Sequence, residues 1–446
     1  MTPSSKRHHT LLSCLLLTLL PLCSHADDAP LFTPQWLGAQ YSFVDQNQSR
    51  VHSPYNGPLS VKADGSTARS HTFGAYFGIA LPWHFQYYWD VEMFKGEGVS
   101  NATGLGGLTN GDIIRSGTAN LGKRPYVARS YLRWVLPLSN DTTEVGRGQD
   151  QLPGHEAIKH LEVKIGLMAV NDDFDKNRYA NATRTQFMNW SLWNNTAWDF
   201  ASDTRGYTDG VMIGWIMKGW ALRYGIYRMP VEANGQALVK SLGAASGQQL
   251  ELTLQPKPDG WALRFLGYYN KGNLGIYQQA IEVAQLTGKV PDIHADDAPD
   301  RHKFGVGING ELPVADNGDT GFFMRAGWND GHTESFIFAE VDRLLSGGFQ
   351  LSGAHWHRSD DRLGVGIAVE GLSPSHVQYL QLGGDGFLLG DGGLRYGPEQ
   401  IAELYYSIAV IDHLTLSPDL QFIRNPGYNR DRGPARFAGL RAHIQF

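Results

Sequence analysis

Cysteine is nearly absent from this chain of 446 residues. The two that occur, Cys14 and Cys23, lie in residues 1–26, which we predict to be a secretory signal peptide. This segment has a basic start and a Leu-rich run at 11–22 that is too short to span a bilayer as a helix. Residues 27–446 then contain no cysteine, which excludes disulfides, thiol chemistry and Cys-ligated metals from the mature chain.

Long apolar runs and an excess of positive charge are also missing. After residue 26, no stretch approaches the roughly 18 consecutive apolar residues that a transmembrane helix needs. Removal of the leader takes away two cations and no anion, so the formal net charge changes from −6 to −8. An acidic balance of this size argues against nucleic acid as a partner.

Glycine and aromatic residues are abundant, with 53 Gly, 20 Phe, 19 Tyr and 12 Trp. Many of the aromatic residues lie in segments where apolar and polar side chains alternate. Between Phe85 and Met93, for example, every second residue is aromatic or aliphatic, and the residues between them are Gln86, Tyr88, Asp90 and Glu92. A period of two indicates a β-strand with one apolar and one polar face, whereas a helical period would mix the two faces.

The same alternation recurs along the whole chain. The apolar rows include Leu37, Ala39, Tyr41 and Phe43; Leu161, Val163, Ile165 and Leu167; Phe322, Met324, Ala326 and Trp328; and Leu440, Ala442, Ile444 and Phe446. Short turns at 81–83 and 218–220 separate some strands, and long segments at 95–124, 171–205 and 272–301 separate others. Phe336 to Leu345 fits a strand or a short helix.

Turns at one rim and long loops at the other are typical of an outer-membrane barrel, whose apolar face meets lipid and whose polar face meets a wet lumen. We therefore predict an all-β fold: a transmembrane antiparallel β-barrel of about 16 strands, with short periplasmic turns and long extracellular loops. Residues 27–446 are expected to form this single domain. The last strand is expected to pair with the first, near Leu37 to Phe43, and to close the barrel. The terminal Phe446 suits a signal read by the barrel-assembly machinery.

Charged residues of the polar rows are candidates for lining the pore, because charges at membrane depth must face water or each other. An equally weighted alternative is that they pair across strands and brace the wall. The candidates for sugar contact are Asp90, Glu92, Arg129, Tyr131, Arg133, Glu162, Lys164, Arg223, Arg264 and Arg325. Among them, Glu92 and the strand from Arg129 to Arg133 are expected to form the constriction, narrowed by loop 171–205.

Several other patterns are weaker. Gly104 to Gly107 resembles a nucleotide loop only in composition, because it does not follow a buried strand and open a helix. His355 and His357 share a strand face but have no evident third ligand, and Asp296, Asp297 and Asp300 are best explained as an acidic loop tip. The sequence therefore predicts no metal and no cofactor.

Other segments resemble a known family, the carbohydrate-selective, OprB-like porins. They include Arg184-Thr-Gln-Phe-Met-Asn-Trp190, Asp203-Thr-Arg-Gly-Tyr207, Gly327-Trp-Asn-Asp330, Tyr396-Gly-Pro-Glu399 and Asp431-Arg-Gly-Pro434. The resemblance covers nearly all of residues 27–446. It implies a 16-stranded barrel in the bacterial outer membrane that passes mono- or small oligosaccharides by facilitated diffusion, as a monomer or a homotrimer surrounded by outer-membrane lipid.

Three other functions stay open from the residues alone. A channel for polysaccharide export or for acidic sugars needs a wider or strongly cationic lumen. A barrel enzyme that acts on lipid needs a serine or histidine at the lipid interface, for which His355, His357 and His413 are the only hints. A purely structural barrel would have a pore that is blocked from end to end.

Overall fold

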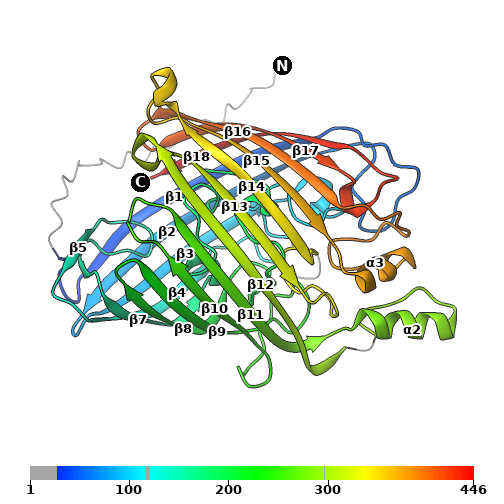
Figure 1. The fold of residues 1–446 in the computed structure, drawn as a ribbon, viewed down its shortest axis with the longest axis horizontal. Helices are drawn as coiled ribbons and strands as arrows, with labels where there is room; N and C mark the ends of the chain where they lie inside the picture. Colours follow the sequence, from blue (N-terminus) through cyan, green and yellow to red (C-terminus); the bar gives the residue numbers. More distant parts are fainter. Residues whose placement is uncertain (1–27, 116–120, 296) are drawn as a thin grey trace, which may run out of the picture.

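The computed structural model describes residues 28–115, 121–295 and 297–446. The predicted signal peptide lies outside these residues, as does Asp296. Sixteen antiparallel strands form one closed barrel, and a two-stranded hairpin stands outside the barrel sheet (Figure 1). The predicted fold class is therefore confirmed. Among the described residues, no helix is long and apolar enough to cross a bilayer.

The first half of the barrel contains β1 (Pro34–Gln48), β2 (Ser66–Leu81), β3 (Phe85–Gly96), β4 (Tyr126–Pro137), β7 (His160–Met168), β8 (Thr208–Met217), β9 (Trp220–Arg228) and β10 (Ser246–Leu254). The second half contains β11 (Ala262–Leu274), β12 (Ala298–Ala315), β13 (Thr320–Asn329), β14 (Arg343–Ser352), β15 (Arg362–Gly371), β16 (Glu399–Ile411), β17 (Leu414–Arg424) and β18 (Ala435–Gln445). The separate hairpin is β5 (Thr142–Val145) and β6 (Gly154–Ala157). The helices are α1 (Trp190–Trp193), α2 (Tyr277–Thr287) and α3 (Pro374–Gln381), with short 3-10 turns at Val99–Ala102, Val170–Asp172, Asp316–Gly318, Gly353–Trp356 and Pro426–Tyr428.

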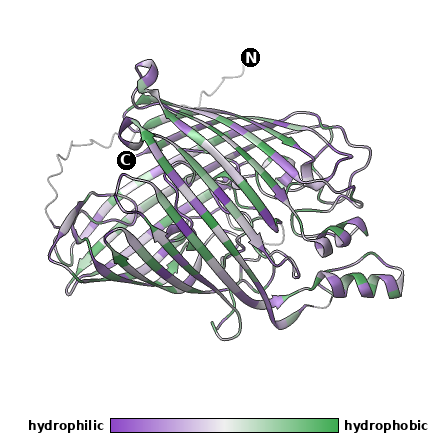
Figure 2. Cartoon of the chain, viewed as in Figure 1, coloured by the Kyte–Doolittle hydropathy of each residue, from purple (hydrophilic) through white to green (hydrophobic). Residues whose placement is uncertain are grey.

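The alternation along each strand separates two environments, and Figure 2 shows hydrophobic and hydrophilic residues alternating along the barrel strands. In β3, Trp89 and Met93 are exposed on the outside, whereas Tyr88, Asp90 and Glu92 are buried inside. In β13, Phe322 and Met324 are exposed and Arg325 is fully buried. The outward row meets lipid and the inward row meets the lumen, as the pattern predicts.

The seam between the two chain ends is also as predicted. Strand β18 pairs antiparallel with β1, so that Ile444 lies opposite Tyr41 and Ala442 lies opposite Phe43. Leu440 and Phe446 are exposed on the outer face, whereas Arg441 is buried inside.

The predicted outward row of β1 is wrong for one residue, Leu37. Leu37 is only 3% exposed, while its neighbour Trp36 is 48% exposed. The pairing of β1 with β2 shifts between Trp36 and Gly38, which is a bulge that leaves Leu37 as the extra residue. An extra residue inverts the facing of everything on one side of it, so Leu37 points inward although Tyr41 points outward.

The two rims differ in the length of their connections. At one rim, called the turn rim below, β2 and β3 are joined by residues 82–84, β8 and β9 by 218–219, and β16 and β17 by 412–413. At the opposite rim, called the loop rim, the connections are long and carry α2 and α3 (Figure 1). The segment predicted as a loop at 272–301 is shorter, 275–297, and contains α2. Phe336 to Asp342 is neither strand nor helix, and β14 begins at Arg343.

The prediction of short turns at one rim is wrong for one connection. Residues 138–159 join β4 to β7 at the turn rim, and they contain the β5–β6 hairpin. The tip of this hairpin folds back onto the inner wall, where Gln149 Nε2 donates to Asp90 Oδ2 at 3.3 Å. The Leu152 amide donates to the Tyr88 hydroxyl at 3.1 Å. The hairpin tip therefore occupies part of the lumen at this rim.

Candidate functional site: a narrowed passage through the barrel

A long loop, residues 169–207 between β7 and β8, crosses the interior of the barrel. Its backbone is held by charged side chains of the opposite wall. Arg325 on β13 donates to the carbonyls of Leu192 at 2.8 Å and Ala180 at 2.7 Å. Glu403 on β16 accepts the amides of Met188 at 2.6 Å and Asn189 at 2.9 Å. The loop therefore fills this half of the lumen, whereas the sequence analysis expected loop 171–205 to narrow the constriction.

A second loop also folds inward, which the sequence analysis did not predict. Between β3 and β4, the Gly106 amide donates to Glu399 on β16 at 3.2 Å. The carbonyl of Thr109 accepts a hydrogen bond from Gln421 on β17 at 2.8 Å. The glycines of segment 104–107 are buried here.

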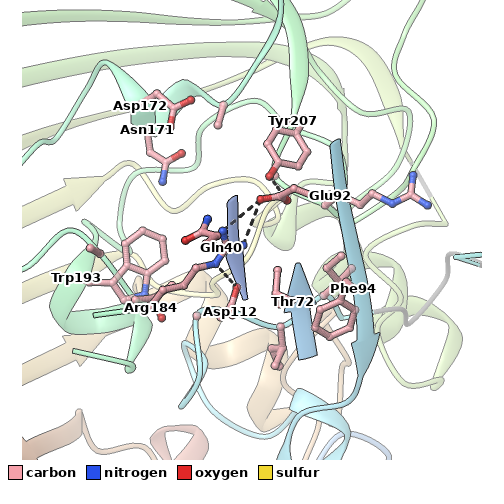
Figure 3. A pocket seen from close by; sticks show the side chains of 18 of the residues that line it. Gln40, Thr72, Glu92, Phe94, Asp112, Asn171, Asp172, Arg184, Trp193 and Tyr207 are labelled. Carbon is pink, nitrogen blue, oxygen red and sulfur yellow. Dashed lines mark hydrogen bonds and ion pairs between the residues drawn. The ribbon is translucent and has the colours of Figure 1, made fainter. Parts of the chain in front are cut away.

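A cavity of about 350 Å³ remains between these loops and the wall made by β1 to β4 and β18. Its wall residues are Gln40, Thr72, Glu92, Phe94, Tyr126, Arg129, His443 and Gln445. From the loops it is lined by Asp112, Asn171, Asp172, Thr183, Arg184, Trp190, Trp193, Phe200, Arg205, Tyr207 and Phe338, among others. Figure 3 shows Glu92 on the wall and Arg184, Asp112 and Tyr207 on the loops around this space.

One side of the cavity is charged. Arg184 lies between two carboxylates, with Nη1 at 3.2 Å from Glu92 Oε1 and Nε at 2.8 Å from Asp112 Oδ1 (Figure 3). Tyr207 donates its hydroxyl to the other oxygen of Glu92. Burial lowers the pKa of Arg184, but Asp112 and Glu92 raise it well above the ordinary value. Arg184 is therefore a permanent cation in the passage.

Arg129 joins three parts of the chain. It forms a bidentate pair with Asp172 of the inward loop, at 2.7 and 2.9 Å. Its Nη1 lies 3.2 Å from Asp90 of β3, and its Nε lies 3.3 Å from Asp150 of the hairpin tip. Burial raises the pKa of Asp172, but the charge of Arg129 outweighs it and keeps this pKa below the usual value. The wall, the loop and the hairpin thus meet at one guanidinium group.

Aromatic rings line another part of the cavity. Trp190 stacks on Phe338 at 4.8 Å between ring centroids and lies 4.6 Å from Trp193. Among the described residues, the indole Nε1 of Trp193 and the Nε2 of His443 have no hydrogen-bond partner. His443 is fixed through its other nitrogen, Nδ1, which lies 2.8 Å from Ser42 Oγ. The cavity thus offers the flat faces of these rings, whereas the two unpartnered nitrogens are buried in the surrounding packing.

The cavity continues toward the turn rim. A second space of about 630 Å³ is lined by residues of β1, β16 and β18 and by the hairpin tip. The two spaces share Gln149, Thr185, His443 and Gln445 in their linings. The hairpin tip therefore lies where the two spaces meet.

The comparison with known proteins agrees with this architecture. Residues 95–446 match the model of the family described as carbohydrate-selective porin, OprB family. The chain belongs to this family of porins. It is therefore an outer-membrane channel for carbohydrates.

One solved structure, that of a porin at high pH, shows the same fold. The high-pH structure of Pseudomonas putida OprB is 18% identical, with a TM-score of 0.66 over 93% of this chain and 94% of that chain. The low-pH structure of Pseudomonas putida OprB is 14% identical, with a TM-score of 0.48 over 93% of this chain and 92% of that chain. No curated protein matches the chain. The porin fold is thus kept at low sequence identity.

Two of the ten predicted site residues, Glu92 and Arg129, line the cavity of the porin. The other eight point inward but lie beside the passage. Asp90 binds Arg129, and Tyr131 packs on Tyr88 at 5.4 Å. Arg133 lies 2.5 Å from Glu162 and 2.7 Å from Glu156 of β6.

The remaining four predicted residues bind the wall or the inward loop. Lys164 pairs with Asp173 at 2.6 Å and Arg264 with Glu311 at 3.2 Å. Arg223 reaches Thr253 at 3.5 Å, and Arg325 binds the loop as described. Arg223 and Arg264 thus brace the wall of this porin, whereas Lys164 and Arg325 hold its inward loop.

The predicted list contains none of the cavity residues that come from loops. Arg184, Tyr207 and Trp190 lie within segments quoted above for the family resemblance. The density of charged and aromatic residues in that loop could have indicated that they line the cavity. Asp112 and Trp193 carried no such signal.

The histidines considered as metal ligands do not converge. His355 lies at the turn rim, 3.0 Å from Asp316, and His357 follows it with a left-handed backbone conformation. A different group, His294, Asp297 and Glu334, brings ligand atoms within 4.8 Å of one another in loops of the loop rim, outside the lining of the passage.

Proposed function

We propose that the passage conducts neutral mono- or small oligosaccharides by facilitated diffusion, down their gradient and without a cofactor. The observation that carries this proposal is the mixed lining of the cavity. Hydroxyl groups of a sugar find donors and acceptors on Arg184, Glu92 and Arg129, while the apolar faces of its ring find Trp190 and Trp193. Each contact is modest, as transport requires, because a tight site would trap the solute.

The charge of the lining favours neutral over acidic sugars. Three carboxylates, Glu92, Asp112 and Asp172, face three guanidinium groups, Arg129, Arg184 and Arg205. Their formal charges cancel, whereas a channel for acidic sugars needs an excess of cations. Two loops and a hairpin tip also occupy the lumen, which disfavours the export of a polysaccharide.

We propose that the protein makes and breaks no bonds. His413, one of the histidines considered for a lipid-directed enzyme, lies at the turn rim with its ring 5.4 Å from that of Phe446. His413 therefore packs at the barrel seam, which is a structural role. The turn rim is expected to face the periplasm and the loop rim the exterior.

We further propose that the protein is a monomer or a homotrimer and that outer-membrane lipid surrounds its outer face. Phe446 is proposed to be read by the barrel-assembly machinery, since its ring is 45% exposed at the end of the closing strand.

Single-channel recording with neutral and acidic sugars tests the proposal. In a planar bilayer, glucose added at millimolar concentration is expected to interrupt the ion current, and glucuronate at the same concentration is expected to interrupt it less. Equal or stronger interruption by glucuronate would favour the acidic-sugar channel. An unaltered current with both sugars, together with no swelling of reconstituted liposomes in glucose, would exclude a sugar passage.

A further inference from the structure

A cluster of cations lies on the outer face at the loop rim, away from the sugar passage. An open cavity of about 620 Å³ there is lined by Thr67, Ala68, Arg69, Lys95, Gly96, Glu97 and Lys123. Arg69, Lys95 and Lys123 are exposed, and Glu97 is the one carboxylate in this lining. We call Arg69, Lys95 and Lys123 the rim cluster.

The register of β2 and β3 places the rim cluster directly above lipid-facing side chains. His71 lies opposite Lys95, and one step toward the middle of the barrel Phe73 lies opposite Met93. Phe73 is 39% and Met93 37% exposed on the outer face. The apolar band therefore ends at this pair, and the basic residues begin at the next one.

The apolar column continues below this border. Phe77 lies opposite Trp89, and their rings stack at 5.4 Å between centroids. Alternation keeps Trp89, Met93 and Lys95 on one face of β3. The outer surface of these two strands thus has an apolar lower part and a cationic upper part.

The charge of the rim cluster is only partly neutralised by its neighbours. Arg69 Nε lies 2.7 Å from Asp45 of β1, but two thirds of the Arg69 side chain stays exposed. His71 Nδ1 forms a hydrogen bond with the Tyr41 hydroxyl at 2.7 Å. Asp45 and Glu97 carry two negative charges and the rim cluster carries three positive charges. An excess of positive charge therefore remains at the border of the apolar band.

We propose that the rim cluster binds the phosphate group of an anionic lipid in the outer leaflet, whose acyl chains lie along Phe73, Met93 and Trp89. Guanidinium and ammonium groups are the usual partners of phosphate oxygens, and cations near a membrane surface each add to lipid binding. An amphiphile matches both parts of the surface, whereas free phosphate would use only the cations. The inference rests on the proposed lipid contact of the outer face and not on the sugar passage.

Native mass spectrometry of the detergent-solubilised protein with diphosphoryl lipid A tests the proposal. The triple variant R69Q/K95Q/K123Q is expected to bind this lipid about tenfold more weakly than the unaltered protein. The matched control K159Q/K218Q/K257Q removes two exposed lysines, Lys218 and Lys257, and the half-buried Lys159 at the turn rim, and it is expected to bind like the unaltered protein. Lipid A without phosphate groups is expected to bind weakly and equally to all three proteins.

Three results would overturn the proposal. They are equal loss of binding in the two triple variants, equal binding of the phosphorylated and unphosphorylated lipids, and displacement of the lipid by millimolar inorganic phosphate, which would indicate a site for free phosphate. Glucose entry into liposomes separates this proposal from the sugar channel. It is expected to be unchanged in R69Q/K95Q/K123Q, and this also shows that the variant is folded. Failure of glucose entry in the unaltered protein would refute the sugar passage and leave the lipid site standing.

Discussion

At the residue scale, the passage combines groups that are satisfied by the protein with groups that are not. Arg184 is neutralised by Glu92 and Asp112, so it stays in place without solute. The indole nitrogen of Trp193 and the Nε2 of His443 have no partner among the described residues. Both nitrogens are buried, so a sugar contacts the rings of Trp190 and Trp193 and not these atoms.

Replacing Trp193 by Leu removes a flat ring from the cavity lining. Loss of the contact between this ring and a sugar costs about 1 kcal/mol, so the glucose concentration for half-maximal current block is expected to rise about fivefold. Trp198→Leu is the matched control, because Trp198 is also a buried tryptophan of the same loop and is absent from the cavity lining. An equal rise in the two variants would show that Trp193 acts only through loop packing.

Replacing Arg184 by Gln removes a cation from the narrow part and leaves Glu92 and Asp112 with excess negative charge. We expect the reversal potential in a KCl gradient to shift toward cation preference, and Arg184→Lys to restore most of the original value. Arg178→Gln serves as the control, since Arg178 belongs to the same loop but pairs with Glu311 at 3.9 Å outside the cavity lining. A shift of the same size in the control would refute the position assigned to Arg184.

At the element scale, the β5–β6 hairpin is the unexpected part of this barrel. Its tip is held by Tyr88, Asp90 and Arg129, all of which lie on β3 and β4. Gln149 at the tip lines both halves of the passage. The width of the exit at the turn rim therefore depends on whether this tip stays docked.

The docking of the hairpin tip is expected to depend on pH through Asp150. Burial raises the pKa of Asp150 to about 6, against the attraction of Arg129; the other charged groups around it are Asp90, Asp172, Lys164 and Asp173. The docked state binds the proton more tightly than the released state, whose pKa is near the ordinary value of about 3.9. Docking is therefore strengthened as the pH falls from above 6 to about 4, and weakened as the pH rises through 6.

Conductance of the reconstituted porin is expected to fall between pH 7 and pH 4, and Asp150→Asn is expected to flatten this dependence. A variant in which a short Gly-Ser turn replaces residues 142–157 measures the conductance without the hairpin. It should conduct more than the unaltered protein at pH 4. A pH dependence that persists in the shortened variant would assign the titration to another group.

At the scale of the whole molecule, the barrel is closed by its two chain ends. Phe446 adds its own backbone bonds to the seam, since its amide donates to the Ala39 carbonyl at 2.9 Å and its carbonyl accepts the Ala39 amide at 3.2 Å. Its ring faces outward, as do Leu440 and Tyr41.

Deleting Phe446 is expected to lower the amount of folded porin in the outer membrane severalfold, because the seam loses two hydrogen bonds and the proposed assembly signal. Channels that do form should keep their preference for glucose, since Phe446 lies outside the narrow cavity. Phe446→Tyr keeps an aromatic end and is the control, with near-normal amounts expected. Normal insertion after the deletion, combined with altered sugar preference, would contradict both roles.

Much of the fold was determined by the sequence alone. Alternation is a local property of a strand, so the facing of Asp90, Glu92, Arg325 and Arg441 followed from their immediate neighbours. The bulge at Leu37 escaped this reasoning, because an extra residue in one strand is visible only in its pairing with the next.

The passage, in contrast, was decided by the tertiary structure. Inward facing does not distinguish Glu92, which lines the cavity, from Arg325, which binds the backbone of a loop. That difference depends on contacts between residues far apart in the chain, such as Glu403 with the amides of residues 188 and 189. These contacts fill one half of the lumen and leave the cavity beside β1 to β4 and β18. The alternating sequence therefore specified a barrel with a polar interior, and the packing of its loops specified where a sugar can pass.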